Sequence, residues 1–215
     1  IHKKRPTTGK SSKKNNKKSR MKHRAFKVKF KDQLHWYKVK DDANWNKAIK
    51  LEVQGLIDKG TFEWVNRTKD MHVINSRFVL TVKRLANGTM DRLKARLVAR
   101  GDQQKSGSAQ TYAPVSDLVT FRAIIMKYIM FGGYIAQADA KQAFLQAFVP
   151  DDQEIYVKPP KGICKLLGLG PEYEERVWKL NKALYGLDNS PRLWYNLLRG
   201  ILHEFDYEVT EDNQG

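Results

Sequence analysis

The sequence has a single cysteine, Cys164, among its 215 residues, so it forms no disulfide within the chain. That is typical of proteins kept in a reducing compartment. The sequence also has no apolar run of the roughly 18 residues that a membrane-spanning helix needs, and its first residues lack the apolar core of a secretory signal. We therefore expect a soluble intracellular protein with no membrane partner.

Acidic residues are almost missing from the first 40 positions, which hold 16 lysines and arginines and one acid, Asp32. The other 175 positions hold 24 basic and 22 acidic residues, so nearly all of the formal net charge of +17 lies at the N-terminus. The strong positive charge is therefore a property of the N-terminal segment and not of the rest of the chain.

Residues 1–24 are poor in apolar side chains and rich in Lys, Ser and Asn, a composition that predicts a disordered tail. Its basic clusters contain Lys3, Lys4, Arg5, Lys13, Lys14, Lys17 and Lys18. Such clusters serve in nuclear import or in binding nucleic-acid phosphates, and charge alone leaves both roles open. In residues 25–40, apolar and basic residues alternate, which predicts a possible strand. We expect a basic tail over 1–40 and a folded domain over 41–215.

The folded part shows helical and strand periodicities bounded by caps, glycines and turns. Helices are expected from Asp42 to Gly60 and over Leu118–Phe131, Lys141–Phe148 and Arg192–Phe205, and strands over Thr61–Val65, Val73–Lys83, Leu93–Arg100, Tyr134–Ala138 and Val177–Leu180. The last helix is expected to turn Leu193, Leu197, Ile201 and Phe205 inward, with Ser190 as a possible cap and Pro191 suited to the first turn. This mixture predicts an α+β fold, with a mixed, mainly antiparallel sheet and helices on one side.

Two of these strands, 73–83 and 93–100, flank an Asn87-Gly88 turn and form a basic hairpin. By the strand period of two, one face of the second strand carries Lys94, Arg96 and Val98, and the other carries Leu93, Ala95 and Leu97. Converging Lys and Arg side chains can hold a triphosphate or a nucleic-acid backbone. An ordinary solvent-exposed strand face would show the same residue pattern. Both interpretations stay open.

Asp139 stands where the expected strand 134–138 meets the expected helix 141–148. A carboxylate at such a junction can hold a metal ion against a phosphate, and the helix start can donate N–H groups to an anion. The same residue is also typical of a plain helix N-cap.

Taken in order, seven short strings resemble the reverse transcriptase domain of Ty1/copia-type retrotransposons, over about Asp42 to Tyr207. They are Trp45-x-x-Ala48-x-x-x-Glu52, Gly60-Thr61-Phe62-Glu63, KARLVARGDQQ (94–104), TYAPVSDLVTFR (111–122), QADAKQAFL (137–145), IYVKPPKG (155–162) and VWKLNKALYGLDNSPRLWY (177–195). The resemblance implies the fingers and part of the palm of an RNA-directed DNA polymerase.

The resemblance also implies partners and a cofactor. Nucleotidyl transfer to a primer 3′-hydroxyl would use Mg²⁺ or Mn²⁺, with a dNTP, a DNA primer and an RNA template. Other parts of the Pol polyprotein, integrase and ribonuclease H, would be neighbours, in the nucleus or in a cytoplasmic retroelement particle.

Carried over by position, Asp139 matches a catalytic metal ligand, and Lys94 and Arg96 match residues that grip the triphosphate. Gln142 and Ala143 would offer backbone N–H groups to the triphosphate. Phe144 matches an aromatic gate against the nucleotide sugar, although it could equally be core. Tyr185, Gly186, Ser190 and Pro191 match the turn that positions template and nucleotide.

This chain departs from the family pattern at several places. Ala140 stands where the family usually has Val, and Asp188 and Asn189 replace Lys and Gln. No aromatic-x-Asp-Asp string occurs, so the second metal motif of the family is missing. We therefore expect a C-terminally truncated domain, inactive alone because one carboxylate does not hold two metals. The alternatives are a non-catalytic nucleic-acid-binding remnant of a retroelement and a product without function.

Overall fold

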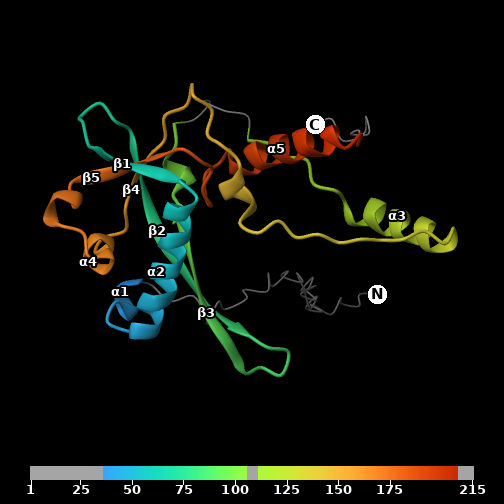
Figure 1. Cartoon of the computed structure of the whole chain (residues 1–215), viewed down its shortest axis with the longest axis horizontal. Coiled ribbons are helices and arrows are strands. Elements are labelled where there is room, and N and C mark those ends of the chain that lie inside the picture. The colour runs from blue at the N-terminus through green and yellow to red at the C-terminus, as the bar shows by residue number, and fades with distance from the viewer. Residues whose placement is uncertain (1–35, 106–110, 208–215) are drawn as a thin grey trace, which may run out of the picture. The chain divides into compact units, whose positions relative to one another are not determined.

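A computed structural model describes residues 36–105 and 111–207, and side chains from Lys38 onward. The elements all belong to one compact unit, Asp32–Gly215 (Figure 1). The helices are α1 (Trp36–Val39), α2 (Ala43–Asp58), α3 (Leu118–Met130), α4 (Ile163–Leu167) and α5 (Ser190–Glu204), with 3-10 turns η1 (Gly101–Gln103), η2 (Ala143–Gln146) and η3 (Pro171–Tyr173). The strands are β1 (Phe62–Asn66), β2 (Val73–Arg84), β3 (Met90–Ala99), β4 (Tyr156–Lys158) and β5 (Arg176–Leu180).

The strands form one sheet in the order β1-β5-β4-β2-β3. β1–β5, β5–β4 and β2–β3 are antiparallel, and β2–β4 is parallel. This confirms the mixed, mainly antiparallel sheet and the α+β character expected from the sequence.

None of the helices in the described ranges has both the length and the apolar character needed to cross a bilayer.

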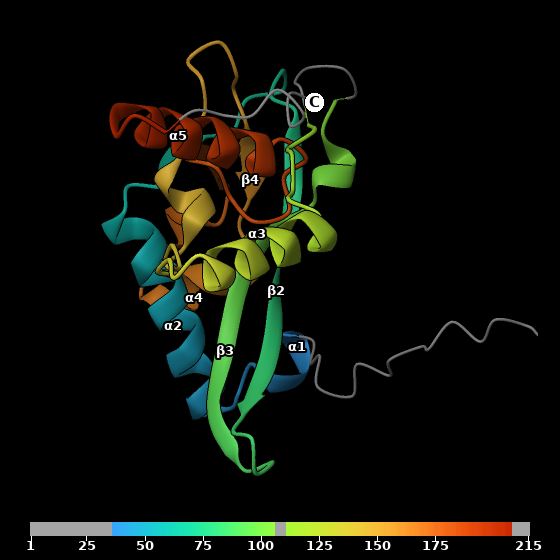
Figure 2. The ribbon, with the colours of Figure 1, turned by 90° about the vertical axis from the view of Figure 1, so that its right-hand side faces the viewer.

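Helix α2 lies along the hairpin of β2 and β3 (Figure 2). Of the two candidate caps in the sequence, Asp41 and Asp42, it is Asp42 that caps the helix, because its carboxylate accepts from the N–H groups of Asn44 at 2.8 Å and Trp45 at 3.1 Å. These bonds satisfy N–H groups that have no partner inside the helix. The helix buries its apolar stripe, Trp45, Ile49, Val53 and Leu56.

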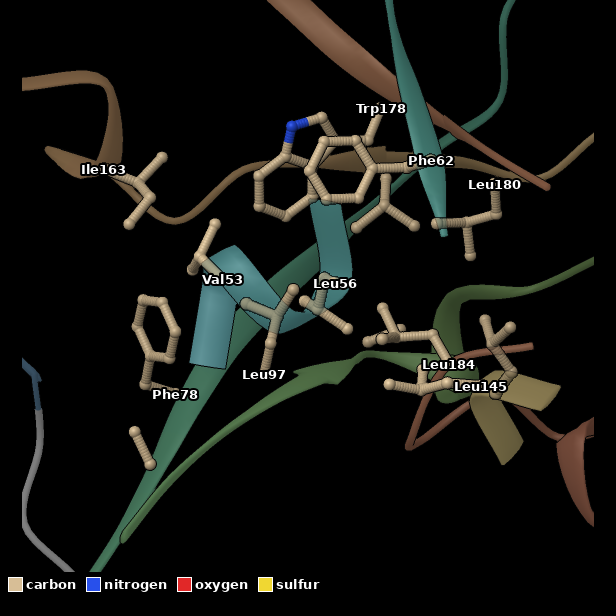
Figure 3. Close-up of a cluster of buried hydrophobic side chains, with 14 of the residues drawn as sticks. Val53, Leu56, Phe62, Phe78, Leu97, Leu145, Ile163, Trp178, Leu180 and Leu184 are labelled. Carbon is tan, nitrogen blue, oxygen red and sulfur yellow. The ribbon is translucent and has the colours of Figure 1, made fainter. Parts of the chain in front are cut away.

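The core lies between α2, α4 and one face of the sheet (Figure 3). Phe62 stacks on the fully buried Trp178 with 4.3 Å between ring centroids. Leu145 and Leu184 continue this core beyond the sheet. Burying apolar surface stabilises the fold by about 25 cal/mol per Å², so the core holds together β3, η2 and the turn after Leu184.

The predicted strand 134–138 and helix 141–148 are both wrong. Residues 133–140 have no regular structure and are exposed, because no strand of the sheet pairs with them. Gln142 adopts a left-handed φ of 52° that allows only the short turn η2 to follow. Beyond η2 the chain is extended, since Ala147 has extended backbone angles and Phe148 forms a bridge with Lys182.

Helix α3 forms where predicted but its apolar face is exposed, and α5 is less buried than predicted. No residue of α3 is buried, and Phe121 is 53% exposed. In α5, which begins at Ser190 and not Arg192, Leu193 and Leu197 are half-buried, but Ile201 and Phe205 are exposed. Helix α5 packs against η2, and its residues from Leu198 onward are exposed.

Three shorter predictions also need correction. The possible strand over 25–40 ends in a helix, α1, while 25–35 lies outside the described residues, as does the expected disorder of 1–24. The glycine-rich segment after Pro160, where the sequence predicted no helix, contains α4 between two left-handed glycines, Gly162 and Gly168. Strand β4 was missed because its three residues are too few to show a periodicity.

Candidate functional site

The free edge of β3 is covered by two other segments of the chain. β3 is the last strand of the sheet, so alternate N–H groups point away from β2. Leu97 N–H donates to Glu52 Oε1 at 3.0 Å, Ala99 N–H to the Tyr185 carbonyl at 2.8 Å, and Gly101 N–H to the Gly186 carbonyl at 2.9 Å. Helix α2 and the turn at 185–187 are thereby fixed against the strand that carries the basic pair Lys94 and Arg96.

The turn approaches β3 so closely that glycine is required on both sides. Gly186 has a φ of +88°, and a Cβ there would lie 2.3 Å from the carbonyl oxygen of Ala99. A Cβ on Gly101 would lie 2.3 Å from the carbonyl oxygen of Gly186. Only residues without side chains bring these two backbones into hydrogen-bond contact.

Tyr185 lies at the centre of a small cluster formed by distant segments. The Arg96 guanidinium carbon is 5.8 Å from the Tyr185 ring centroid, and the Phe144 ring centroid is 5.2 Å away, tilted by 59°. Burial raises the pKa of the Tyr185 hydroxyl, the positive charge of Arg96 opposes this, and the negative charges of Glu52 and Asp139 add to the rise. The structure therefore brings together three residues predicted separately: Arg96, Phe144 and Tyr185.

Lys94 and Arg96 lie on the same face of β3, as the strand period predicted. Lys94 is half-buried and Arg96 is exposed, while Ala95 and Leu97 face the core. Partial burial lowers the pKa of the Lys94 ammonium, and the positive charges of Arg96, Lys83 and Arg92 lower it further. This mutual repulsion is relieved by a bound polyanion, which is the ligand class that such a cluster attracts.

Asp139 is an exposed carboxylate on the irregular segment before η2. Its negative charge adds to the rise in the pKa of the Tyr185 hydroxyl, after burial and the charge of Glu52. Within residues 36–105 and 111–207, no three His, Cys, Asp or Glu side chains gather as a metal site would require. The residues around Asp139 therefore do not fit a two-metal centre, although one carboxylate can serve as a single Mg²⁺ ligand beside substrate phosphates.

Gln142 and Ala143 stand at the start of η2, where a helix N-terminus was predicted. Gln142 takes the left-handed N-cap position of η2 and Ala143 begins the turn, which is four residues long. A short 3-10 turn has a much weaker dipole than an α-helix. The predicted contact of these N–H groups with a triphosphate stays a prediction.

Ser190 and Pro191 begin α5, but Ser190 is not its cap. Its fully buried hydroxyl donates to the carbonyl of Leu184 at 2.6 Å and ties the helix to the preceding turn. The cap position is Asn189, whose amide donates to Gln153 Oε1 at 2.9 Å. Pro191 stands in the first turn, as predicted.

One hollow of the surface, about 380 Å³ in volume, contains none of the predicted site residues. Its lining includes three carboxylates, from Asp70, Asp152 and Glu154. These carboxylates give the hollow a negative character, in contrast to the basic pair on β3.

Sequence reasoning missed the structural roles of Glu52, Gly101 and Gln104. Gln104 Oε1 accepts from the N–H of Asp188 at 2.8 Å and so links the loop after β3 to the turn. The sequence gave two signals for Glu52: it is an acid beside the buried stripe of α2, and it ends the string Trp45-x-x-Ala48-x-x-x-Glu52. The tail residues Lys3, Lys4, Arg5, Lys13, Lys14, Lys17 and Lys18 lie outside the described residues.

The comparisons with known proteins agree with these motifs. The family model described as reverse transcriptase (RNA-dependent DNA polymerase) matches residues 59–215. No solved structure matches the chain.

Three relatives are named as polyproteins of transposons. The chain is 33% identical, over 75% of its length, to the retrovirus-related Pol polyprotein from transposon RE1 of Arabidopsis thaliana. It is 32% identical, over 69%, to that from transposon TNT 1-94 of Nicotiana tabacum, and 31% identical, over 76%, to the transposon Ty1-DR4 Gag-Pol polyprotein of Saccharomyces cerevisiae. These alignments span only 10–11% of the relatives' own lengths.

The family match and the relatives agree with the seven strings found in the sequence, three of which the structure joins at the edge of β3. The chain belongs to the reverse transcriptase (RNA-dependent DNA polymerase) family, as a domain related to those of Ty1/copia-type Pol polyproteins.

Proposed function

We propose that this chain is the fingers and partial palm of an RNA-directed DNA polymerase, and that its site binds an incoming deoxynucleotide. The observation that carries the proposal is the cluster of Arg96, Tyr185 and Phe144 beside Lys94, held by backbone contacts at the edge of β3. Family membership supports the same substrate class.

Each part of the nucleotide has a matching surface in this proposal. The triphosphate lies against Lys94 and Arg96, whose mutual repulsion it relieves. The sugar lies against the half-buried ring of Phe144, where a 2′-hydroxyl would be crowded. The turn with Tyr185 and Gly186, followed by Ser190 and Pro191, supports the template and the base.

Divalent cations supply charge neutralisation and an activated 3′-hydroxyl in polymerases of this kind. Asp139 would hold one Mg²⁺ or Mn²⁺ together with the triphosphate. The described residues do not supply carboxylates for a second ion, so the chain alone is expected to bind nucleotide without extending a primer. A primer-extension assay that detects synthesis abolished by Asp139→Asn would contradict this.

Calorimetric titration of the chain with dTTP and Mg²⁺ tests the nucleotide site. Arg96→Ala and Lys94→Ala should each weaken binding about tenfold or more, because hydrogen bonds to charged groups contribute about 1.5–3 kcal/mol. Lys47→Ala, which removes an exposed lysine from α2, is the matched control. Equal affinities for Arg96→Ala and Lys47→Ala would refute the assignment.

The role of Phe144 is tested by competition between dTTP and UTP. Phe144→Ala should reduce the preference for the deoxynucleotide, while Phe148→Ala, at an exposed ring on the same segment, should not. An unchanged preference in Phe144→Ala would leave the ring with a packing role only.

A second function, non-catalytic nucleic-acid binding, is favoured by the charge of the first 40 residues. It predicts binding to single-stranded RNA or DNA with little sequence preference and a steep fall in affinity with salt. Deleting residues 1–24 should then flatten the salt dependence and leave dTTP binding intact. Partners from the same Pol polyprotein, such as integrase and ribonuclease H, belong to this proposal, as does a nuclear or particle location.

A further inference from the structure

Glu52 is an acid from another element that bonds to the strand carrying the basic pair. It stands on α2, and its Oε1 accepts from the N–H of Leu97 at 3.0 Å across 45 positions of sequence. Leu97 is the residue next to Arg96, and its side chain is fully buried. This hydrogen bond therefore fixes the backbone of β3 at the point from which the guanidinium extends.

The groups facing Glu52 are basic or uncharged. Burial raises the pKa of this carboxyl, whereas the Leu97 hydrogen bond and the charges of Arg96 and Lys94 hold it down. From the turn, the hydroxyl of Tyr185 is close enough for the charge of Glu52 to raise its pKa. The carboxylate thus interacts with all three segments of the nucleotide site: α2, β3 and the turn.

We infer that Glu52 is a positioning residue, which holds the edge of β3 through its bond to Leu97 and so fixes Lys94 and Arg96 for a nucleoside triphosphate. The inference rests on the proposed function for its ligand. The position of β3 itself does not depend on that function. A carboxylate here competes weakly with the phosphates for the same cations, so its acceptor oxygen, and not its charge, is what the site requires.

Two substitutions separate the oxygen from the charge. Glu52→Gln keeps an acceptor for Leu97 N–H and loses the charge, while Glu52→Ala loses both. Gln54→Ala is the matched control, since Gln54 is exposed on the same helix and bonds only to Asp58 among the described contacts. All three are made in the full chain and checked for folding by circular dichroism.

Binding of Mg²⁺–dTTP is the first measurement. Glu52→Ala should weaken binding about tenfold, a typical coupling between residues in contact, and Glu52→Gln should bind at least as tightly as the native chain. The affinity of the native chain should rise as the pH is lowered and Glu52 becomes protonated. The affinity of Glu52→Gln should show no such change over the same pH range. The inference would be overturned if Glu52→Ala bound dTTP as tightly as Gln54→Ala. It would also be overturned if Glu52→Gln bound as weakly as Glu52→Ala.

A second measurement keeps the test independent of nucleotide binding. The amide resonance of Leu97 should shift with pH, with a midpoint above the usual range of a glutamate, and should stay flat in Glu52→Gln. A native amide that does not titrate overturns the positioning role. A titrating amide in a chain that binds no dTTP would instead refute the proposed function and leave the edge contact established.

Discussion

The close approach of Gly186 to β3 makes a quantitative prediction. Gly186→Ala would place a Cβ 2.3 Å from the Ala99 carbonyl oxygen and 2.5 Å from Val98 Cγ1. The nearest atom is backbone of a paired strand and does not move aside, so the turn must withdraw. Withdrawal breaks the hydrogen bonds from Ala99 N–H at 2.8 Å and Gly101 N–H at 2.9 Å.

The size of the effect follows from two contributions. A non-glycine residue in the left-handed region costs about 1–2 kcal/mol, and two lost hydrogen bonds cost about 0.5–1.5 kcal/mol each, so the loss is about 2–5 kcal/mol. For a chain of this size that corresponds to a fall in Tm of roughly 5–15 °C. The loss is a large share of a stability that is typically about 5–15 kcal/mol.

Urea unfolding followed by tryptophan fluorescence measures this loss, because Trp178 is fully buried in the core. Gly88→Ala is the matched control: Gly88 has a φ of +82°, but a Cβ there meets nothing within 4 Å. The control should carry only the left-handed penalty of about 1–2 kcal/mol. Equal unfolding midpoints for Gly186→Ala and Gly88→Ala would refute the view that close contact with β3 fixes the turn.

Three further predictions concern the core and the edge of the sheet. Trp178→Ala should destabilise the fold by about 3–5 kcal/mol in the same urea assay. Trp178→Phe should cost clearly less, because the buried indole N–H has no partner among the described residues. Equal losses for the two variants would contradict this. Ser190→Ala should cost about 1–3 kcal/mol by leaving the Leu184 carbonyl unsatisfied, and native-like stability would mean that water replaces the hydroxyl. The pKa of Glu52 is raised in the folded state, so the folded chain binds the proton more tightly than the unfolded chain. The stability contributed by protonated Glu52 should therefore fall as pH rises from the usual glutamate pKa through the raised one. Glu52→Gln should remove this pH-dependent component from unfolding curves measured between pH 4 and 8.

The first half of the domain was largely predictable because its signals are local. Asp42 caps α2 through its own side chain, and Asn87-Gly88 closes a hairpin between adjacent strands. The basic and apolar faces of β3 follow from a period of two that the hairpin preserves. Each of these features depends on residues a few positions apart, so pattern and propensity were sufficient.

The segment around Asp139 was mispredicted because its structure depends on distant partners. Alternation at 134–138 favours a strand, but a strand forms only against a paired neighbour. The apolar residues after Lys141 are compatible with a helix and with an extended chain. The bridge between Phe148 and Lys182 favours the extended chain. Ser190 was expected to cap α5, yet the carbonyl of Leu184 takes its hydroxyl.

The sequence by itself determined the family, the basic pair on one face of β3 and the aromatic residues at 144 and 185, because residue type and order along the chain carry that information. Only the tertiary structure decided that the turn at Gly186 and the carboxylate of Glu52 both close the free edge of β3. Those hydrogen bonds join positions 45 to 86 residues apart. Their formation depends on which backbone groups the sheet leaves unpaired, and no local pattern encodes that.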